Sequence, residues 1–550
     1  MKKRYLDLME RALEAYSNEH IVSYFETVKA EGLTEHGFPR LTANIGILIA
    51  HGRKQELQPL FREMMDFCCE SFLKVKAAND FSVKEIIFCI MELNGKGVVA
   101  EERIAHWKKL LSGINPQCYN VYAFTPEDKV YNWACFTGVS EHMREYIGLA
   151  DTGQFVDTQI ASQLQWLDSN KMYKDPGNPM VYDMVPRGLF AVLLHFGYQG
   201  KYQKEMDECL RTTGLLTMKM QSVSGEIPYG GRSNQFLHNE THLALLLEYE
   251  ANRYAKEGNL QLAGIMKAGV EKALDNIEKW LSETPIHHVK NFFPTESSFG
   301  CEDYAYFDKY MITVASFLYV AYVFCNENIP VGNWDRNTAY TLMLSPDFHK
   351  IFLNAGGYFA EYDTDADIHY DVNGLGRVHK EGVPEAICLS LPCTAHPNYY
   401  VDVENPAPLS ICPGYVKNGI PIYGTEPETR HLVHNLSEEG NTAAAVIETV
   451  WKDQSVTSVY GVSEDGVDIE ISGAGEVACL LPAFAFDGAS ATQIESSDHR
   501  LRIFYKGHCC TYYTNGIIED TGRKAANRNG HYRVYQVRGN ECLKIRIVLE

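Results

Sequence analysis

Apolar residues follow a helical spacing up to about residue 345 and alternate beyond it. The helical pattern is clear from Phe307 onward, where apolar residues recur at intervals of three and four: Met311, Val314, Leu318 and Ala321. The alternating pattern is clear at residues 467–471 and 543–547, where charged residues separate the apolar ones. Periods near 3.6 and 2 are typical of amphipathic helices and of strands with one buried face. We therefore expect an all-helical domain over 1–345 and an all-β domain over 346–550.

The helical part has the pattern of a long succession of hairpins. Further stretches with helical spacing, separated by short loops rich in Gly, Pro, Asn and Asp, lie near residues 2–17, 57–76, 82–94, 138–149, 180–196, 202–220, 236–256 and 259–282. They show no fixed-period repeat of the solenoid type. In the β part, the number of strands and turn signals such as residues 464–466 predict a large antiparallel sandwich.

The formal net charge of −21 argues against broad binding to nucleic acid or an anionic membrane, because both need a basic surface. An anionic substrate held by a few focused cations is still allowed. Residues 1–16 have the spacing of an amphipathic helix, not of a secretory signal. The longest uncharged apolar run, 310–325, is shorter than the roughly 20 residues that span a bilayer. We expect a soluble, cytoplasmic protein with reduced cysteines, whose composition is compatible with a homodimer.

Residues 225–242, GEIPYGGRSNQFLHNETH, carry more polar groups than the start of a helix needs. A helix beginning at residue 233 or 234 would place His238 and His242 on one face, because residues four apart share a face. Neighbouring side chains complete the polar group expected at this end: Asn239, Arg232 and Tyr229. This concentration favours a functional site.

The two histidines also allow other interpretations. They are compatible with partly buried side chains that are hydrogen-bonded across helices, or with zinc ligands at helical spacing. A zincin would need Glu directly after the first histidine, where this chain has Asn239. No metal ligand is assigned to this stretch.

Three further segments carry candidate residues. Tyr304, Tyr306 and Tyr310 precede or open an apolar helix, where one phenol could transfer a proton and ordinary amphipathic packing is the alternative. In the second segment, Arg187 could pair bidentately with a carboxylate, and an ordinary ion pair with Asp183 is the alternative. In the third, Arg377 and His379 alternate with Val378 and so share one face of a strand, which could point them into an interdomain cleft. The candidates in these two segments are Asn132, Tyr182, Asp183 and Arg187, and, near the domain junction, Arg377 and His379.

A helical-hairpin domain, a large antiparallel sandwich and a segment rich in Tyr, Arg, His and Asn together resemble the heparinase II/III-like and oligoalginate lyase group of polysaccharide lyases. The segments YGGRSNQFLHNE (229–240) and VNGLGRVHKEG (372–382) look most like the exo-acting L-rhamnose-α-1,4-D-glucuronate lyases. The resemblance implies an α+β multidomain fold, an (α/α) toroid over 1–345 followed by an antiparallel β-sandwich over 346–550. It also implies a carbon–oxygen lyase that cleaves a 4-linked uronic acid glycoside by β-elimination. A cytoplasmic enzyme of this kind would act in exo fashion on imported oligosaccharides such as rhamnosyl-glucuronate.

The chemistry gives these residue types roles. A uronate loses its C5 proton only if its carboxylate is neutralised or hydrogen-bonded, for which we predict Asn239 and Arg232. His238 is the predicted base, since its ordinary pKa is about 6.5, and Tyr306, or else Tyr304, is the predicted acid. A tyrosine base with a pKa lowered by Arg232 stays open.

By resemblance, Arg377 and His379 would contact the substrate from the sandwich side. The reaction needs no cofactor, and His369 and Asp371 are spaced as structural ligands of a divalent metal in the sandwich. The lyase hypothesis predicts that 229–242, 304–310 and 377–379 meet in one cleft.

Two other functions remain open. A glycoside hydrolase on the same toroid needs a carboxylate pair, such as Asp183 with Glu240 or Glu302 with Asp303. A non-catalytic carbohydrate-binding protein needs only the aromatic residues and Arg232.

Overall fold

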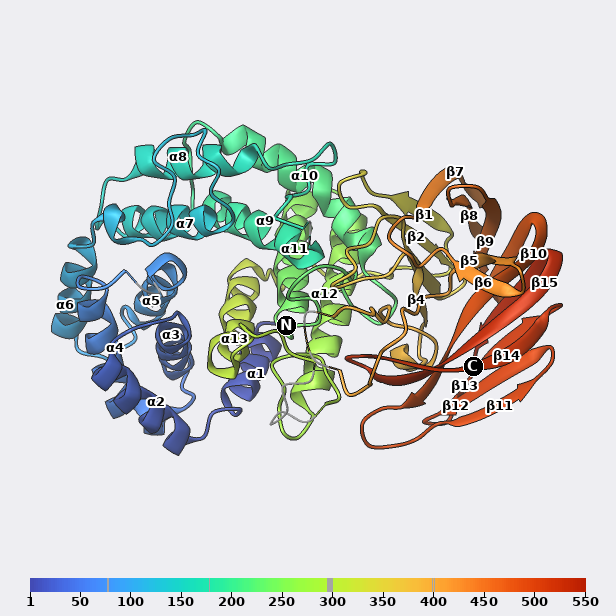
Figure 1. Ribbon diagram of the computed structural model, residues 1–550. Coiled ribbons are helices and arrows are strands. Elements are labelled where there is room, and N and C mark those ends of the chain that lie inside the picture. Colours follow the sequence, from blue (N-terminus) through green and yellow to red (C-terminus); the bar gives the residue numbers. More distant parts are fainter. Residues whose placement is uncertain (77–78, 178, 294–299, 398, 400) are drawn as a thin grey trace.

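The helices and strands occupy separate parts of the chain, as predicted (Figure 1). The computed structural model describes residues 1–550 apart from 77–78, 178, 294–299, 398 and 400. Within the described residues, the last α-helix ends at Phe324 and the first strand begins at Tyr340.

Six helices form a closed inner ring in which each contacts the next and the last contacts the first. They are α3 (Gly37–Ala50), α5 (Asn79–Leu93), α7 (Trp133–Tyr146), α9 (Met180–His195), α11 (Asn239–Lys256) and α13 (Phe307–Phe324). The outer helices are α1 (Lys2–Leu13), α2 (Asn18–Glu31), α4 (Gln58–Ser71), α6 (Glu101–Ser112), α8 (Gly153–Leu164), α10 (Gln203–Met220) and α12 (Leu260–Leu281). Short 3₁₀ turns lie at Gln55–Leu57, Pro116–Cys118 and Glu385–Ile387. Inner and outer helices alternate along most of the chain, so this part is the predicted α/α toroid.

One predicted helix start is wrong. Helix α11 begins at Asn239, not at residue 233 or 234, because Ser233 and Gln235 have left-handed φ angles of 58° and 65°. The backbone of 232–238 is bonded to other segments, as in the bond from Leu237 N to His288 O at 3.0 Å. Helix α13 is long and apolar enough to cross a membrane, but it lies in the inner ring with 67% of its apolar window buried.

The strands form two antiparallel sheets. The smaller one has the order β1 (Tyr340–Met343), β2 (Lys350–Ala355), β3 (Tyr358–Asp363) and β4 (Gly374–Lys380). The larger one has the order β11-β12-β13-β15-β10-β9-β8-β7, and in it β14 pairs with β15, β5 with β10 and β6 with β5. Its strands are β5 (Pro413–Lys417), β6 (Ile420–Tyr423), β7 (Arg430–Glu439), β8 (Thr442–Val450), β9 (Ser455–Ser463), β10 (Gly466–Phe486), β11 (Gln493–Ser497), β12 (Arg500–Tyr505), β13 (His508–Thr514), β14 (Ile517–Asn527) and β15 (Gly530–Leu549).

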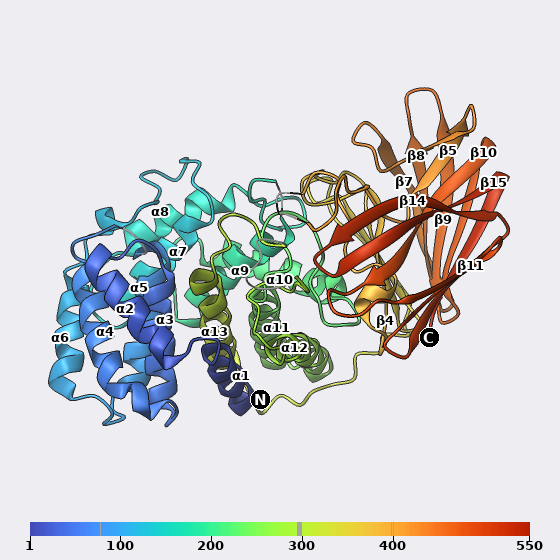
Figure 2. The same cartoon turned by 60° about the horizontal axis from the view of Figure 1, so that its bottom comes forward.

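The smaller sheet is a middle layer between the toroid and the larger sheet (Figures 1 and 2). Strands β2 and β3 are buried on both faces. On β2, Ile351 and Leu353 join the sandwich core, whereas Phe352 packs in a cluster with Met180 and Met220 of the toroid. Polar side chains on the toroid face of this sheet are therefore buried between the two domains.

Candidate functional site

A pocket of about 180 Å³ lies at one end of the inner ring. Each inner helix contributes to it from its cap or first turn: Arg40 from α3, Phe81 from α5, Asn132 before α7, Tyr182 from α9, His242 from α11 and Tyr310 from α13. A helix N-terminus carries about half a positive charge, so six of them facing one pocket favour an anionic ligand. Below it, the ring axis is filled by Lys84, Phe88, Leu189, Leu245 and Val320, among others, which closes the pocket at its inner end.

Arg40 is the fixed cation of the pocket and is only 2% exposed. Its Nη1 donates to Thr313 Oγ1 at 2.8 Å and lies 3.0 Å from His36 Nδ1. Its Nε lies 3.6 Å from Glu85, which also pairs with Lys84. Burial lowers the pKa of Arg40, and Glu85 partly offsets this. Among the described residues, Arg40 Nε has no hydrogen-bond partner, so the guanidinium is held in place but keeps hydrogen-bonding capacity for a ligand.

The charges of the described lining residues do not cancel. Among the described residues that line the pocket, two cations, Arg40 and Lys309, stand against one carboxylate, Glu35. The difference is one positive charge. The charge balance and the six helix N-termini therefore both favour a ligand with a single negative charge.

His238 and Tyr310 lie together at the pocket wall. Their rings are nearly parallel, with centroids 5.9 Å apart, and the His242 ring is 5.8 Å from that of His238. Burial, helped by Arg40, lowers the pKa of His238 to about 3, and burial raises the pKa of Tyr310 well above its ordinary value. Among the described residues, His238 Nδ1 and both ring nitrogens of His242 have no hydrogen-bond partner. Buried polar atoms in this state are uncommon and indicate a site shaped for a ligand.

Several predicted residues are brought together here. His238, His242, Tyr310, Tyr182 and Asn132 line the pocket. Two more lie beside it: Tyr304 and Arg232. The Tyr304 hydroxyl is 2.7 Å from Ser233 Oγ, and the Arg232 guanidinium covers the Tyr182 ring at 4.6 Å while pairing with Asp175.

Other predicted residues lie elsewhere. Tyr306 is 66% exposed. Asn239 is fully buried, and its Nδ2 donates to Ser233 O at 3.0 Å, which ties the loop 232–238 to the start of α11. Tyr229 is buried against the middle sheet, where its backbone N–H donates to Glu361 at 3.1 Å. Asp183 and Arg187 form a buried ion pair inside the toroid, which was the alternative interpretation of that segment.

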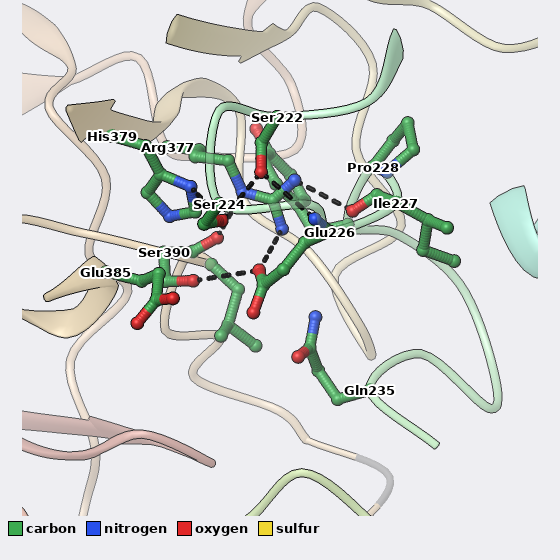
Figure 3. A network of polar contacts seen from close by, with 12 residues as sticks. Ser222, Ser224, Glu226, Ile227, Pro228, Gln235, Arg377, His379, Glu385 and Ser390 are labelled. Atoms are coloured by element: carbon green, nitrogen blue, oxygen red, sulfur yellow. Dashed lines mark hydrogen bonds and ion pairs between the residues drawn. The ribbon is translucent and has the colours of Figure 1, made fainter. Parts of the chain in front are cut away.

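Arg377 and His379 belong to a separate polar network between toroid and sandwich, shown in Figure 3. Arg377 donates to Ile227 O at 2.8 Å and to Glu361 at 2.9 Å, and it pairs with Glu226 at 3.3 Å. His379 Nδ1 is 3.1 Å from Ser224 Oγ. Of the three segments predicted to meet in one cleft, only parts of 229–242 and 304–310 do so. Strand β4, which carries Arg377 and His379, is buried in the middle layer between the toroid and the larger sheet.

The residues suggested for a metal do not fit one. The His369 ring is 3.1 Å from the backbone oxygen of His396, and Asp371 Oδ2 is 3.9 Å from the Lys350 ammonium, which would repel a cation. In the described part of the chain, no three His, Cys, Asp or Glu side chains are grouped as ligands.

Sequence reasoning missed Arg40 and His36, which also line the pocket. A usable signal existed for Arg40, which is the charged residue in the run GFPRLTANIGILIA. Every residue of that helix is buried, and an arginine is rarely retained there without a partner or a function.

No protein-family model matches this sequence, and no curated protein matches it. Solved structures do match its fold. A mutant of the heparan sulfate lyase HepC from Pedobacter heparinus aligns with a TM-score of 0.51 at 8% identity, over 93% of this chain and 76% of that one. A mutant of the chondroitin AC lyase from Streptomyces coelicolor A3 aligns with a TM-score of 0.50 at 10% identity, over 99% and 79%. The chain therefore has the fold of the polysaccharide lyases that join a helical toroid to a sheet domain.

Proposed function

We propose that this protein is a polysaccharide or oligosaccharide lyase that cleaves a 4-linked uronic acid glycoside by β-elimination. The observation that carries the proposal is the stacked pair of His238 and Tyr310 beside Arg40, in a pocket at six helix N-termini. A neutral imidazole, a protonated phenol and a fixed cation are the three groups that this elimination needs.

In the proposed reaction, Arg40 and Asn132 hold the uronate carboxylate, where negative charge develops as the C5 proton leaves. The unpartnered Nδ1 of His238 accepts that proton. The electron pair of the C5–H bond forms the C4–C5 double bond as the C4–O bond breaks. Tyr310 protonates the leaving oxygen, and exchange with water restores both side chains. Tyr310 replaces Tyr306 as the acid because Tyr306 points into solvent.

The closed inner end and the volume of about 180 Å³ suit one sugar ring at a chain end, which supports exo action. One uronate matches the single unbalanced positive charge, whereas a sulfated sugar would add negative charge without a further cation to meet it. These features support an unsulfated substrate such as rhamnosyl-glucuronate. Action in the cytoplasm on imported oligosaccharides belongs to the same proposal, and cell fractionation would test it.

A glycoside hydrolase has less support. Glu35 is the carboxylate in the described lining of the pocket. Three of the candidates predicted for a hydrolase are engaged in buried ion pairs: Asp183 with Arg187, Glu240 with Lys290 at 2.7 Å and Glu302 with Arg528 at 2.7 Å. The fourth, Asp303, is exposed and does not line the pocket. Hydrolysis needs a free acid and a free base or nucleophile on either side of the bond.

The test follows the ultraviolet absorbance of the C4–C5 unsaturated product with a panel of 4-linked uronides. We expect the absorbance to rise with the natural protein and to slow by roughly 10²–10⁴-fold in both His238→Ala and Tyr310→Phe, because each removes a proton-transfer group. Tyr306→Phe is the matched control and should retain the natural rate. Release of reducing sugar without unsaturated product would contradict the proposal.

A further inference from the structure

The loop 232–238, which leads into α11, is held in place from the sandwich side. Arg528 lies in the turn between β14 and β15 and is 2% exposed. Its Nε donates to Gly300 O at 2.6 Å, its Nη1 to Asn234 O and its Nη2 to Glu302 Oε2 at 2.7 Å. All three nitrogens of this guanidinium therefore bind toroid segments next to the pocket.

The contacts continue from Glu302 to the pocket. Glu302 Oε1 accepts a hydrogen bond from Ser233 N at 3.2 Å. Ser233 Oγ lies 2.7 Å from the Tyr304 hydroxyl and 3.2 Å from that of Tyr182, which lines the pocket. Ser233 has a left-handed φ of 58°, a conformation that a non-glycine residue keeps only where surrounding contacts hold it.

The turn that carries Arg528 is itself anchored. Asn527 Nδ2 donates to Leu391 O at 2.8 Å, and Phe292 N donates to Arg528 O at 3.0 Å. The guanidinium lies over the Tyr399 ring at 4.2 Å. An arginine stays charged and presents donors in a fixed plane, so the turn offers the loop a rigid support.

We infer that Arg528 is a positioning residue of the pocket: it fixes the loop 232–238 and thereby places His238 and the hydroxyls of Tyr182 and Tyr304. The sandwich domain thus shapes a pocket that the toroid lines. The effect on turnover rests on the proposed function, whereas the effect on the loop does not.

The test compares Arg528→Lys with Arg336→Lys. Lysine keeps the charge but cannot make three divergent bonds from one plane. Arg336 is a matched control because it is also buried, donates to a toroid carbonyl, Gln221 O at 2.8 Å, and covers an aromatic ring, Trp334 at 4.0 Å. In the described part of the chain, its side-chain contacts are with Gln221, Trp334 and Phe359, outside the loop 232–238.

Amide hydrogen exchange of the peptide 229–240 is the primary measurement. We expect Arg528→Lys to speed exchange there by roughly tenfold or more, because local opening becomes easier, and Arg336→Lys to leave it unchanged. With an active substrate, Arg528→Lys should lower kcat by roughly 10–100-fold and change KM less, since misplacement of reacting groups mainly raises the barrier.

Unchanged exchange in Arg528→Lys, or an equal rise in Arg336→Lys, would overturn the inference. So would faster exchange without any change in kcat for a substrate that the natural protein eliminates. If no uronide is eliminated by the natural protein, the proposed function fails, and the exchange data still decide whether Arg528 fixes the loop.

Discussion

At the scale of single residues, burial keeps the polar groups of the pocket in defined protonation states. It lowers the pKa of His238 to about 3, so the imidazole is neutral at neutral pH, and it raises the pKa of Tyr310, so the phenol keeps its proton. Opposite shifts of this kind separate a proton acceptor from a proton donor before substrate binds. The apolar lining therefore fixes the protonation states of both groups, although it transfers no proton itself.

Arg40 gives a prediction at this scale. Replacing it by methionine removes the fixed cation, while Glu85 stays paired with Lys84, so the fold should be retained. A hydrogen bond to a charged group contributes about 1.5–3 kcal/mol, so glucuronate should bind roughly 10–100-fold more weakly. Glucose, which lacks the carboxylate, should bind the variant and the natural protein alike.

Isothermal titration of both sugars into both proteins makes this comparison. Arg40→Lys serves as the charge-conserving control and should keep part of the preference for glucuronate. An equal loss of affinity for glucose and glucuronate would mean that Arg40 shapes the pocket but does not recognise the carboxylate.

At the scale of elements, periodicity finds most of the inner helices although they are almost wholly buried. The stripe from Phe307 predicts α13, and the alternation at 467–471 predicts part of β10. Helix α3 is not among the predicted segments; all its residues are buried, and Arg40 is its charged residue. The sequence predicts a helix from residue 233 or 234, whereas α11 begins at Asn239, because the left-handed conformations of Ser233 and Gln235 depend on contacts with distant segments.

Helix α3 also makes a prediction about packing. Gly46 lies where α3 approaches its neighbours, and a Cβ there would be 2.3 Å from Cys89 Sγ and 2.4 Å from a Phe61 ring carbon. Gly46→Ala should therefore lower the free energy of unfolding by about 1–3 kcal/mol, even though alanine favours a helix more than glycine by roughly 1 kcal/mol.

Urea unfolding measures this effect. Gly153→Ala at the start of α8 is the control, because the nearest atoms to its Cβ would be 3.9 Å away. We expect that variant to be unchanged or slightly more stable. A stabilised Gly46→Ala would show that the inner ring is packed more loosely than these distances indicate.

At the scale of the whole molecule, the pocket combines six helix ends that are far apart in the chain. The sequence showed which residues were chemically unusual, such as His238 and Tyr310, but not which faces would meet. It misplaced Arg377 and His379 because alternation on a strand does not tell a cleft from a covered interface. That requires knowing that the smaller sheet is enclosed between the toroid and the larger sheet.

The enclosed layer predicts a pH-dependent stability. The Lys350 ammonium is surrounded by three carboxylates, from Asp363 at 2.7 Å, Glu361 at 3.6 Å and Asp371 at 3.9 Å. Burial raises the pKa of Asp371 to about 7, with Asp363 adding to the rise and Lys350 and His349 opposing it. Burial likewise raises the pKa of Glu361 to about 7, against Arg377 and Lys350.

Asp371→Asn should therefore flatten the pH dependence of unfolding. As pH rises from about 4 to 7, the unfolded chain releases this proton before the folded protein does, so the natural protein loses stability over that range. Between pH 5 and 7 the decrease in the free energy of unfolding should be on the order of 2 kcal/mol larger in the natural protein than in the variant. Urea midpoints at both pH values measure it, with Asp303→Asn as a substitution at an exposed aspartate. Equal slopes in the natural protein and Asp371→Asn would show that this carboxyl titrates alike in the folded and unfolded chains.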